Sequence, residues 1–152
     1  MNAKFITLKN KEQLPYKRKN LLTENEKRFY KKLKPITDKY NLELLTKIRM
    51  ADIIEVSETV NKTEWSKYFS KIKSKHIDFA ITDKDNLNIL LLIELDDSSH
   101  KEKSRIERDN FINQAYISAG IPIARLYYNT SNLEEIIKMC IKKVTGSIGQ
   151  SR

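Results

Sequence analysis

The sequence predicts an α/β domain, because three of its features indicate a sheet covered by helices. Helix-like and strand-like hydrophobic periods follow one another along 152 residues, a length that suits one domain with a sizeable core. Residues 75–82 and 89–93 read as two strands, and the polar turn between them predicts an antiparallel hairpin. The second strand, Ile89–Ile93, is apolar throughout, as expected of a central strand covered on both faces.

Positive charge is concentrated at the start of the chain. Residues 1–50 carry 14 Lys and Arg against 5 acids, whereas the remaining residues carry 15 against 15, so the net charge of +9 lies in the first third. We therefore expect a basic N-terminal arm over residues 1–20, a folded domain over residues 21–145 and a flexible tail over residues 146–152. Two explanations of the arm are open: a grip on a polyanion, or a solubilising tail.

The composition excludes several kinds of protein. A single cysteine, Cys140, excludes an internal disulfide framework, and without further Cys or paired His it cannot form a zinc cluster. Neither a secretory signal nor an apolar run long enough to span a bilayer is evident, so we expect a cytoplasmic protein without a membrane partner.

The first helix is expected to begin at Thr23. This residue is an N-cap candidate, and Glu26 three residues later completes a capping box. Glu26 also has a second possible role, because it starts the apolar stripe that faces the core. Pro35 predicts a kink or an early end. The stripe consists of Phe29, Leu33, Ile36 and Tyr40.

Residues 43–50 alternate as a first strand, and residues 51–56 are ambiguous between a turn and a short helix. A second helix follows, on which an apolar stripe at helical spacing is interpreted as core rather than as a platform for stacking bases. That stripe consists of Trp65, Tyr68, Phe69 and Ile72.

The hairpin ends in a group of acids. If its turn is centred near Asn86, Asp78 lies across from Glu94, and Asp96 follows on the same face as Glu94. Like charges at such short range destabilise a sheet unless a cation holds them, so one explanation is a divalent metal ion. The other is a strand that reaches the surface and leaves a solvated acidic end.

The helix after His100 is expected to place Arg108 on its core-facing stripe, with Ile112, Ala115 and Ala119, at the end nearest the acids. Arg108 would bind a phosphate there or neutralise a carboxylate, and both roles are open. Gly120 and Pro122 end the helix. The remaining elements are a strand over residues 121–128, which carries Arg125, and a helix opened by a capping box at Ser131 and Glu134. Lys101 and Arg105 extend the basic rim.

Five motifs, in this order, resemble those of the PD-(D/E)XK, or restriction-endonuclease-like, nuclease superfamily. Within it they are most similar to a bacterial domain of unknown function, family 2726. The segment I-E-L-D-D-S-S-H also resembles the E-x-D-G-x-x-H motif of relatives of the very-short-patch mismatch repair endonuclease. The resemblance covers roughly residues 14–128, and its motifs are L-L-T-x-x-E-x-x-F-Y (Leu21–Tyr30), K-H-x-D-F (Lys75–Phe79), I-E-L-D-D-x-S-H (Ile93–His100), R-D (Arg108–Asp109) and A-G-I-P-x-x-R (Ala119–Arg125).

This resemblance implies a restriction-endonuclease-like core, with a central mixed four-stranded sheet flanked by helices, and metal-dependent hydrolysis of phosphodiester bonds. Asp78 matches the first metal-binding acid and Glu94 the second. The sequence departs from the superfamily at Asp96, which stands where its lysine orients the attacking water. Ile77 stands where it often has proline. Lys75 or His100 would then handle the proton.

We therefore predict a Mg²⁺- or Mn²⁺-dependent nuclease that cuts nucleic acid, DNA rather than RNA, with little sequence specificity, as a monomer, a homodimer or part of a larger DNA-processing complex. Asp78, Glu94, Asp96 and Glu26 are the predicted metal ligands. The predicted nucleic-acid contacts are Lys17, Arg18, Lys19, Lys101, Arg105, Arg108 and Arg125. Two alternatives remain: a non-catalytic nucleic-acid-binding module with a degenerate nuclease fold, and a regulatory or interaction domain of a defence or mobile-element system.

Overall fold

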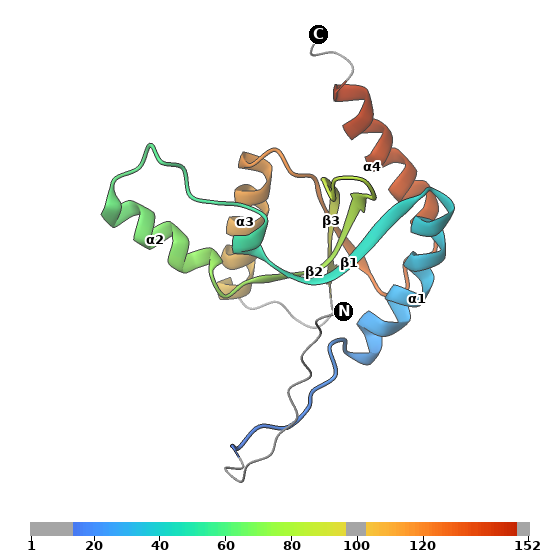
Figure 1. The fold of residues 1–152 in the computed structure, drawn as a ribbon, viewed down its shortest axis with the longest axis horizontal. Coiled ribbons are helices and arrows are strands. Elements are labelled where there is room, and N and C mark those ends of the chain that lie inside the picture. Colours follow the sequence, from blue (N-terminus) through green and yellow to red (C-terminus); the bar gives the residue numbers. More distant parts are fainter. Residues whose placement is uncertain (1–13, 97–102, 149–152) are drawn as a thin grey trace, which may run out of the picture.

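The computed structural model describes residues 14–96 and 103–148, with side chains described for residues 14–96 and 106–142. Helices and strands alternate along the chain (Figure 1). They are α1 (Glu24–Lys39), β1 (Leu42–Arg49), the 3₁₀ turn η1 (Met50–Asp52), α2 (Lys62–Ile72), β2 (His76–Asp83), β3 (Ile89–Asp96), α3 (Lys103–Ser118), β4 (Ile123–Tyr127) and α4 (Leu133–Ile148).

The four strands form one mixed sheet in the order β1-β2-β3-β4. β1 and β3 are both antiparallel to β2, whereas β4 lies parallel to β3, to which α3 connects it. The predicted mixed sheet flanked by helices is thus confirmed, with β3 as an internal strand. None of the helices in the described residues is long and apolar enough to cross a lipid bilayer.

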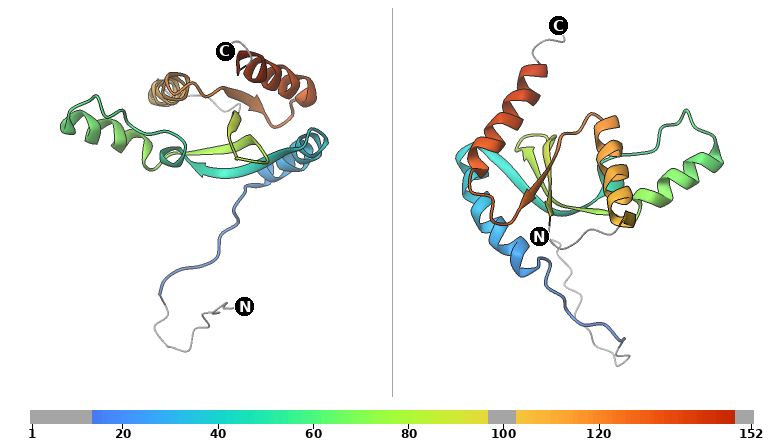
Figure 2. Two further views of the ribbon diagram at one scale, coloured as in Figure 1. Left: turned by 45° about the horizontal axis from the view of Figure 1, so that its top comes forward. Right: turned by 180° about the vertical axis from the view of Figure 1, so that it is seen from behind.

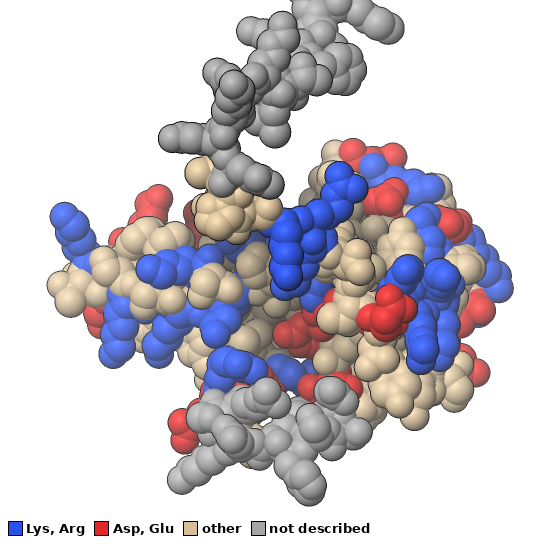
Figure 3. Space-filling view, turned by 90° about the horizontal axis from the view of Figure 1, so that it is seen from below, with Lys and Arg blue, Asp and Glu red and all other residues tan. Residues whose placement is uncertain are grey.

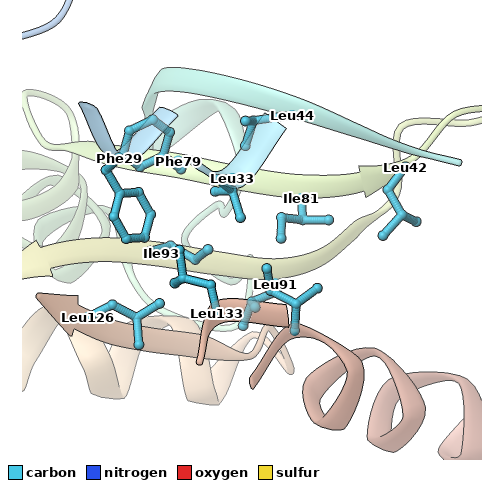
Figure 4. Close-up of a cluster of buried hydrophobic side chains, with 11 residues drawn as sticks. Phe29, Leu33, Leu42, Leu44, Phe79, Ile81, Leu91, Ile93, Leu126 and Leu133 are labelled. Atoms are coloured by element: carbon cyan, nitrogen blue, oxygen red, sulfur yellow. The ribbon is translucent and has the colours of Figure 1, made fainter. Parts of the chain in front are cut away.

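Helices cover both faces of the sheet. α1 and α4 pack on one face, and α3 with η1 packs on the other, while α2 projects beyond α3 (Figures 1 and 2). The larger hydrophobic cluster lies under α1 and α4 (Figure 4). At its centre the rings of Phe29 and Phe79 lie with their centroids 5.5 Å apart, and each ring is fully buried. Burial of one such ring contributes about 1.5–3 kcal/mol to folding.

The hairpin of β2 and β3 is also confirmed. Its turn is closed by the carboxylate of Asp83, which accepts hydrogen bonds from the backbone N–H groups of Asn86 and Asn88 at 2.7 and 3.2 Å. This is the turn chemistry that the short polar residues predict. On the core side the strands pair with Phe79 opposite Ile93, and that register determines which residues meet at the other end of the hairpin.

Two helix boundaries agree with the predicted signals, whereas the early end of α1 that Pro35 was one reason to expect does not occur. Thr23 caps α1 with the expected capping box, and Gly120, just after α3, has a φ of +72°, in the left-handed region that glycine tolerates. However, α1 continues through Pro35 to Lys39, so the proline does not shorten it. Leu33 and Thr37 are buried on either side of Pro35, and their packing holds this turn of the helix against the sheet.

The apolar stripe of α2 is not core, contrary to the prediction. Only Ile72 is buried, Phe69 is partly buried, and Trp65 and Tyr68 are 41% and 42% exposed. The reason is that α2 projects from the sheet, so only its C-terminal end reaches the cluster beneath α3 (Figure 2). Helical spacing predicted the helix, but it did not predict how much of the stripe another element covers.

Candidate functional site

Asp78 and Glu94 lie opposite each other where β2 and β3 separate. The register that pairs Phe79 with Ile93 brings them together one residue further on, as the predicted hairpin requires. At this point the backbone N–H groups donate to side-chain carboxylates instead of to backbone carbonyls of the neighbouring strand. The Asp78 N–H donates to Oε2 of Glu94 at 3.3 Å, and the Leu95 N–H donates to Oδ2 of Asp78 at 3.0 Å. The two carboxylates are therefore held in place by each other's strands.

Glu94 is strongly perturbed by this position. Burial, and then the nearby carboxylate of Asp78, raise the pKa of Glu94 to about 7, although Arg125 opposes the rise. Burial and the proximity of Glu94 also raise the pKa of Tyr116, which is packed on the same side of the sheet. A carboxyl group poised near neutrality beside a second carboxylate indicates a site where an added cation would be favoured.

A lysine that the sequence did not single out lies beside this pair. Lys47 of β1 places its Nζ 3.0 Å from Oδ1 of Asp78 and 2.5 Å from Oε1 of Glu26. Its backbone has a φ of +53°, in the left-handed region that a non-glycine residue rarely adopts within a strand. Burial alone would lower the pKa of Lys47, but hydrogen bonds to the two carboxylates outweigh it and raise the pKa, so the ammonium stays protonated.

Glu26 has the predicted capping role and, in addition, an ion pair with the sheet that the sequence did not predict. One carboxylate oxygen accepts the Thr23 N–H at 2.7 Å, as a capping box requires, and the other accepts from Lys47. Although burial alone would raise the pKa of Glu26, these hydrogen bonds hold it below its ordinary value. The start of α1 is thereby joined to the sheet, and the lysine lies between two acids.

A small pocket opens at this edge of the sheet. It has a volume of about 160 Å³, and acidic side chains lie in the recess at the centre of Figure 3. The pocket is lined by the first turn of α1, the ends of β2 and β3, and the residue after β4, namely by Thr23, Asn25, Glu26, Asp78, Leu95, Asp96 and Tyr128. Three of the four predicted metal ligands therefore face one hollow.

Asp96 belongs to a second group of charges. Arg125 of β4 donates from one guanidinium nitrogen to Oδ1 of Asp96 at 3.1 Å, and the same nitrogen lies 3.5 Å from Oδ2 of Asp109. A second nitrogen donates to the side-chain oxygen of Asn113 on α3 at 3.2 Å. Because the side chain of Arg125 is only 21% exposed and makes these contacts, it positions Asp96 and is poorly placed for the predicted contact with nucleic acid.

The structure does not gather all four predicted metal ligands into one cluster. Glu26 and Asp78 share Lys47, Asp78 and Glu94 share backbone hydrogen bonds, and Asp96 pairs with Arg125. Within residues 14–96 and 103–148, no group of three His, Cys, Asp or Glu side chains is arranged to hold a metal ion. Asp78 and Glu94 are therefore linked to each other through backbone hydrogen bonds. His100 lies outside the described residues.

A family model matches most of the chain. It is described as Protein of unknown function (DUF2726), and it matches residues 18–144. The chain belongs to this family. Neither the search of curated proteins nor the search of solved structures found a match.

The structure of this DUF2726 protein places only some of the basic residues that were predicted to contact nucleic acid at its surface. Lys17, Arg18 and Lys19 are exposed in the irregular segment before α1. Lys101 lies outside the described residues, and so does the side chain of Arg105, which belongs to α3.

Arg108 does not occupy the predicted core-facing stripe. Its side chain is 50% exposed and lies 3.5 Å from Asp109, which with Ile112 and Tyr116 faces the sheet instead. The middle of the predicted stripe is thus confirmed, because Ile112 is buried and Ala115 packs against the same cluster, whereas its two ends, Arg108 and Ala119, are exposed. Lys75 lies in the turn between α2 and β2, and it does not line the pocket that holds Asp78.

Two site residues of the DUF2726 chain were missed by reasoning from sequence. Lys47 lies in register with Asp78 on the neighbouring strand, but this could be predicted only by knowing that β1 pairs with β2. Asp109 follows Arg108 directly, and only the phase of α3 decides which of the two faces the sheet. Residue type gave little signal for Lys47, because β1 also carries Glu43, Thr46 and Arg49.

Proposed function

We propose that this protein is a metal-dependent nuclease that hydrolyses phosphodiester bonds in DNA with little sequence specificity. The observation that carries the proposal is the pair of carboxylates of Asp78 and Glu94 at the open end of the hairpin, with the ammonium of Lys47 beside them. The motif resemblance to PD-(D/E)XK nucleases supports the same assignment. In that superfamily two acids and a lysine act together at such an edge of the sheet.

The residues present suit a magnesium or manganese ion. Mg²⁺ prefers carboxylate oxygens and is usually bound by one or two carboxylates, with water and substrate phosphate as its other ligands. Asp78 and Glu94 would hold it, and Glu26 and Asp96 line the pocket beside them. When bound, the ion would lower the pKa of a water molecule and neutralise charge on the phosphate. The raised pKa of Glu94 fits a site that favours added positive charge.

Lys47 would take the role of the superfamily's lysine, whose position in the motif is occupied here by Asp96. Its ammonium is protonated, so it acts as a hydrogen-bond donor and a positive charge rather than as a base. Transition-state charge on a phosphoryl oxygen is stabilised by such a preorganised donor. Proton transfer is left to His100 or Lys75, the two groups that the sequence indicates. Asp96, held by Arg125, keeps the second edge of the pocket in place.

Substrate would be held mainly through its phosphates. Lys17, Arg18, Lys19 and the half-exposed Arg108 are available for phosphate contacts, and Lys101 and Arg105 continue the same rim in sequence. Such contacts carry little sequence information, which accounts for the weak specificity in the proposal.

The test is cleavage of linear, nicked, branched and single-stranded DNA with Mg²⁺ or Mn²⁺. Cleavage is expected for the wild type and lost in Asp78→Ala and Glu94→Ala. Lys47→Ala should reduce it by roughly 10²–10³-fold, the loss typical of one preorganised donor. Glu135→Gln, which alters an exposed glutamate of α4, is the matched control and should cleave normally.

Thermal melting gives a second measurement that needs no substrate. A metal ion that binds the folded state at 100 times its Kd stabilises it by about 2.7 kcal/mol, so millimolar Mn²⁺ should raise the melting temperature of the wild type and not of Glu94→Ala. Absence of cleavage on every substrate, with DNA binding intact and no thermal shift, would favour a non-catalytic binding module.

A further inference from the structure

α2 exposes aromatic rings among lysines. Trp65 and Tyr68 are the exposed rings, and in residues 61–76 five lysines accompany a single acid, Glu64. In Figure 3, Lys and Arg side chains are spread over the left lobe, which carries α2. An exposed apolar face that served only another protein would not need this excess of positive charge, whereas a polyanion with flat apolar groups matches both features.

The rings are arranged for stacking. The indole of Trp65 lies parallel to the ring of Phe69, with centroids 4.8 Å apart and planes 15° apart. Because Phe69 covers one face of the indole, its exposed area lies on the other face and the edges. Tyr68 lines a groove of about 600 Å³ that is bounded by α2, α3 and residues 54–60. In this groove the ammonium of Lys71 lies 5.7 Å from the Tyr68 ring and 4.7 Å from the Phe111 ring.

α2 leads directly to the candidate site. Only residues 73–75 separate its last residue from β2, whose third residue is Asp78. At 1.5 Å per residue, the helix from Trp65 to Ile72 is about 10 Å long. A strand of nucleic acid that lies along α2 would therefore approach the carboxylates of Asp78 and Glu94 within a few nucleotides.

We propose that α2 is a platform for unpaired nucleotides of the substrate, whose bases stack on Trp65 and Tyr68 while Lys62, Lys67 and Lys71 contact the phosphates. The proposal rests on the proposed function for its ligand, nucleic acid, and it narrows the substrate to DNA with a single-stranded segment beside the cleavage site. Aromatic stacking accepts any base, so it agrees with weak sequence preference. Binding to α2 does not require metal or cleavage.

Trp65 reports on this binding directly, because it is the single tryptophan of the chain. With a chelator present to prevent cleavage, titration with a mixed-sequence single-stranded oligonucleotide should quench its fluorescence, and a blunt duplex of equal length should quench it much less. Anisotropy of a labelled single strand should show about 5- to 150-fold weaker binding by Trp65→Ala, the loss of one stacked base. Trp65→Phe, which keeps an aromatic ring, should lose less.

Charge is tested with a matched pair of variants. Lys67→Gln on α2 should weaken single-strand binding and lower its salt dependence, whereas Lys84→Gln, in the exposed turn at the far end of the hairpin, should change neither. Circular dichroism of each variant establishes that α2 is still folded.

The outcomes separate this inference from the proposed function. Quenching by single strands without metal-dependent cleavage supports the platform and counts against the nuclease. Cleavage with unchanged Trp65 fluorescence, or equal binding by Trp65→Ala and wild type, overturns the platform and leaves the nuclease standing. A fluorescence change that depends on protein concentration without DNA would instead assign the exposed rings to a second copy of the chain, and would also overturn it.

Discussion

Lys47 of β1 and Asp78 of β2 face each other across the sheet, with the lysine Nζ 3.0 Å from Oδ1 of the aspartate. The flanking residues pair in regular register, Thr46 with Phe79 and Ile48 with Ile77, yet Lys47 itself has a φ of +53°. A lysine in this conformation turns out of the regular strand path. The same ammonium also reaches Glu26, so one strained residue joins α1, β1 and β2.

The backbone at Lys47 leads to an unusual order of stabilities. In a regular strand, a glycine variant is less stable than an alanine variant. At a position with positive φ the glycine variant is instead the more stable of the two, by about 1 kcal/mol. Both substitutions remove the ammonium from Glu26 and Asp78, so both should destabilise the protein relative to wild type. We expect Lys47→Gly to be the more stable of the two in urea unfolding. Equal stabilities, or the reverse order, would show that this residue has ordinary strand geometry in solution.

Glu94 predicts a dependence of stability on pH. The pKa of Glu94 is about 7 in the folded protein, against an ordinary value of 4.5, so as the pH rises the folded state keeps this proton after the unfolded chain has lost it. The contribution of Glu94 to stability is therefore unchanged below about pH 4.5 and falls as the pH rises to about 7. In the presence of a chelator, the free energy of unfolding of Glu94→Gln should rise relative to that of the wild type across this pH range, by at most about 3 kcal/mol. Parallel stability curves would rule out the raised pKa.

Arg125 is expected to matter more for stability than Arg108. Arg125→Ala would remove the guanidinium that contacts both Asp96 and Asp109 in a mostly buried setting and should destabilise the protein by about 3 kcal/mol. Arg125→Lys should recover only part, because an ammonium lacks the fork that reaches both carboxylates and Asn113. Arg108→Ala removes a half-exposed side chain and should stay within about 0.5 kcal/mol of the wild type. Denaturant unfolding of the three variants measures the order.

The N-terminal basic arm predicts the salt dependence of DNA binding. Each phosphate contact adds about 0.9 to the slope of log K against log salt for duplex DNA. Replacing Lys17, Arg18 and Lys19 together with alanine should therefore lower the slope by up to about 3, and removal of residues 1–20 should lower it at least as much. An unchanged slope in both variants would assign the arm to solubility alone.

Features governed by neighbours in sequence were predictable. The capping box of Thr23 and Glu26, the turn of Asp83 and the position of Gly120 each depend on a few adjacent residues, and the structure shows each of them. The hairpin also brings Asp78 opposite Glu94 as predicted, but the register shifts by one residue between Ile81 and Thr82, and the turn residues do not reveal that shift.

Features that depend on packing between distant segments were not predictable in the same way. Lys47 enters the site only because β1 lies beside β2, and its positive φ leaves no trace in residue type. The phase of α3, which turns Asp109 inward and Arg108 outward, depends on contacts with β4. The exposure of Trp65 likewise depends on how far α2 extends past the sheet, and hydrophobic spacing does not encode that distance.

The order of the strands also bears on how the site forms during folding. β2 and β3 are joined by a short turn, whereas β1 and β4 reach them only across α2 and α3. Short loops close with the least loss of chain entropy, so we expect the hairpin to pair first. Asp78 and Glu94 then meet before Lys47 and Arg125 arrive on the outer strands. The early folding steps therefore bring like charges together, and the compensating cations are added last.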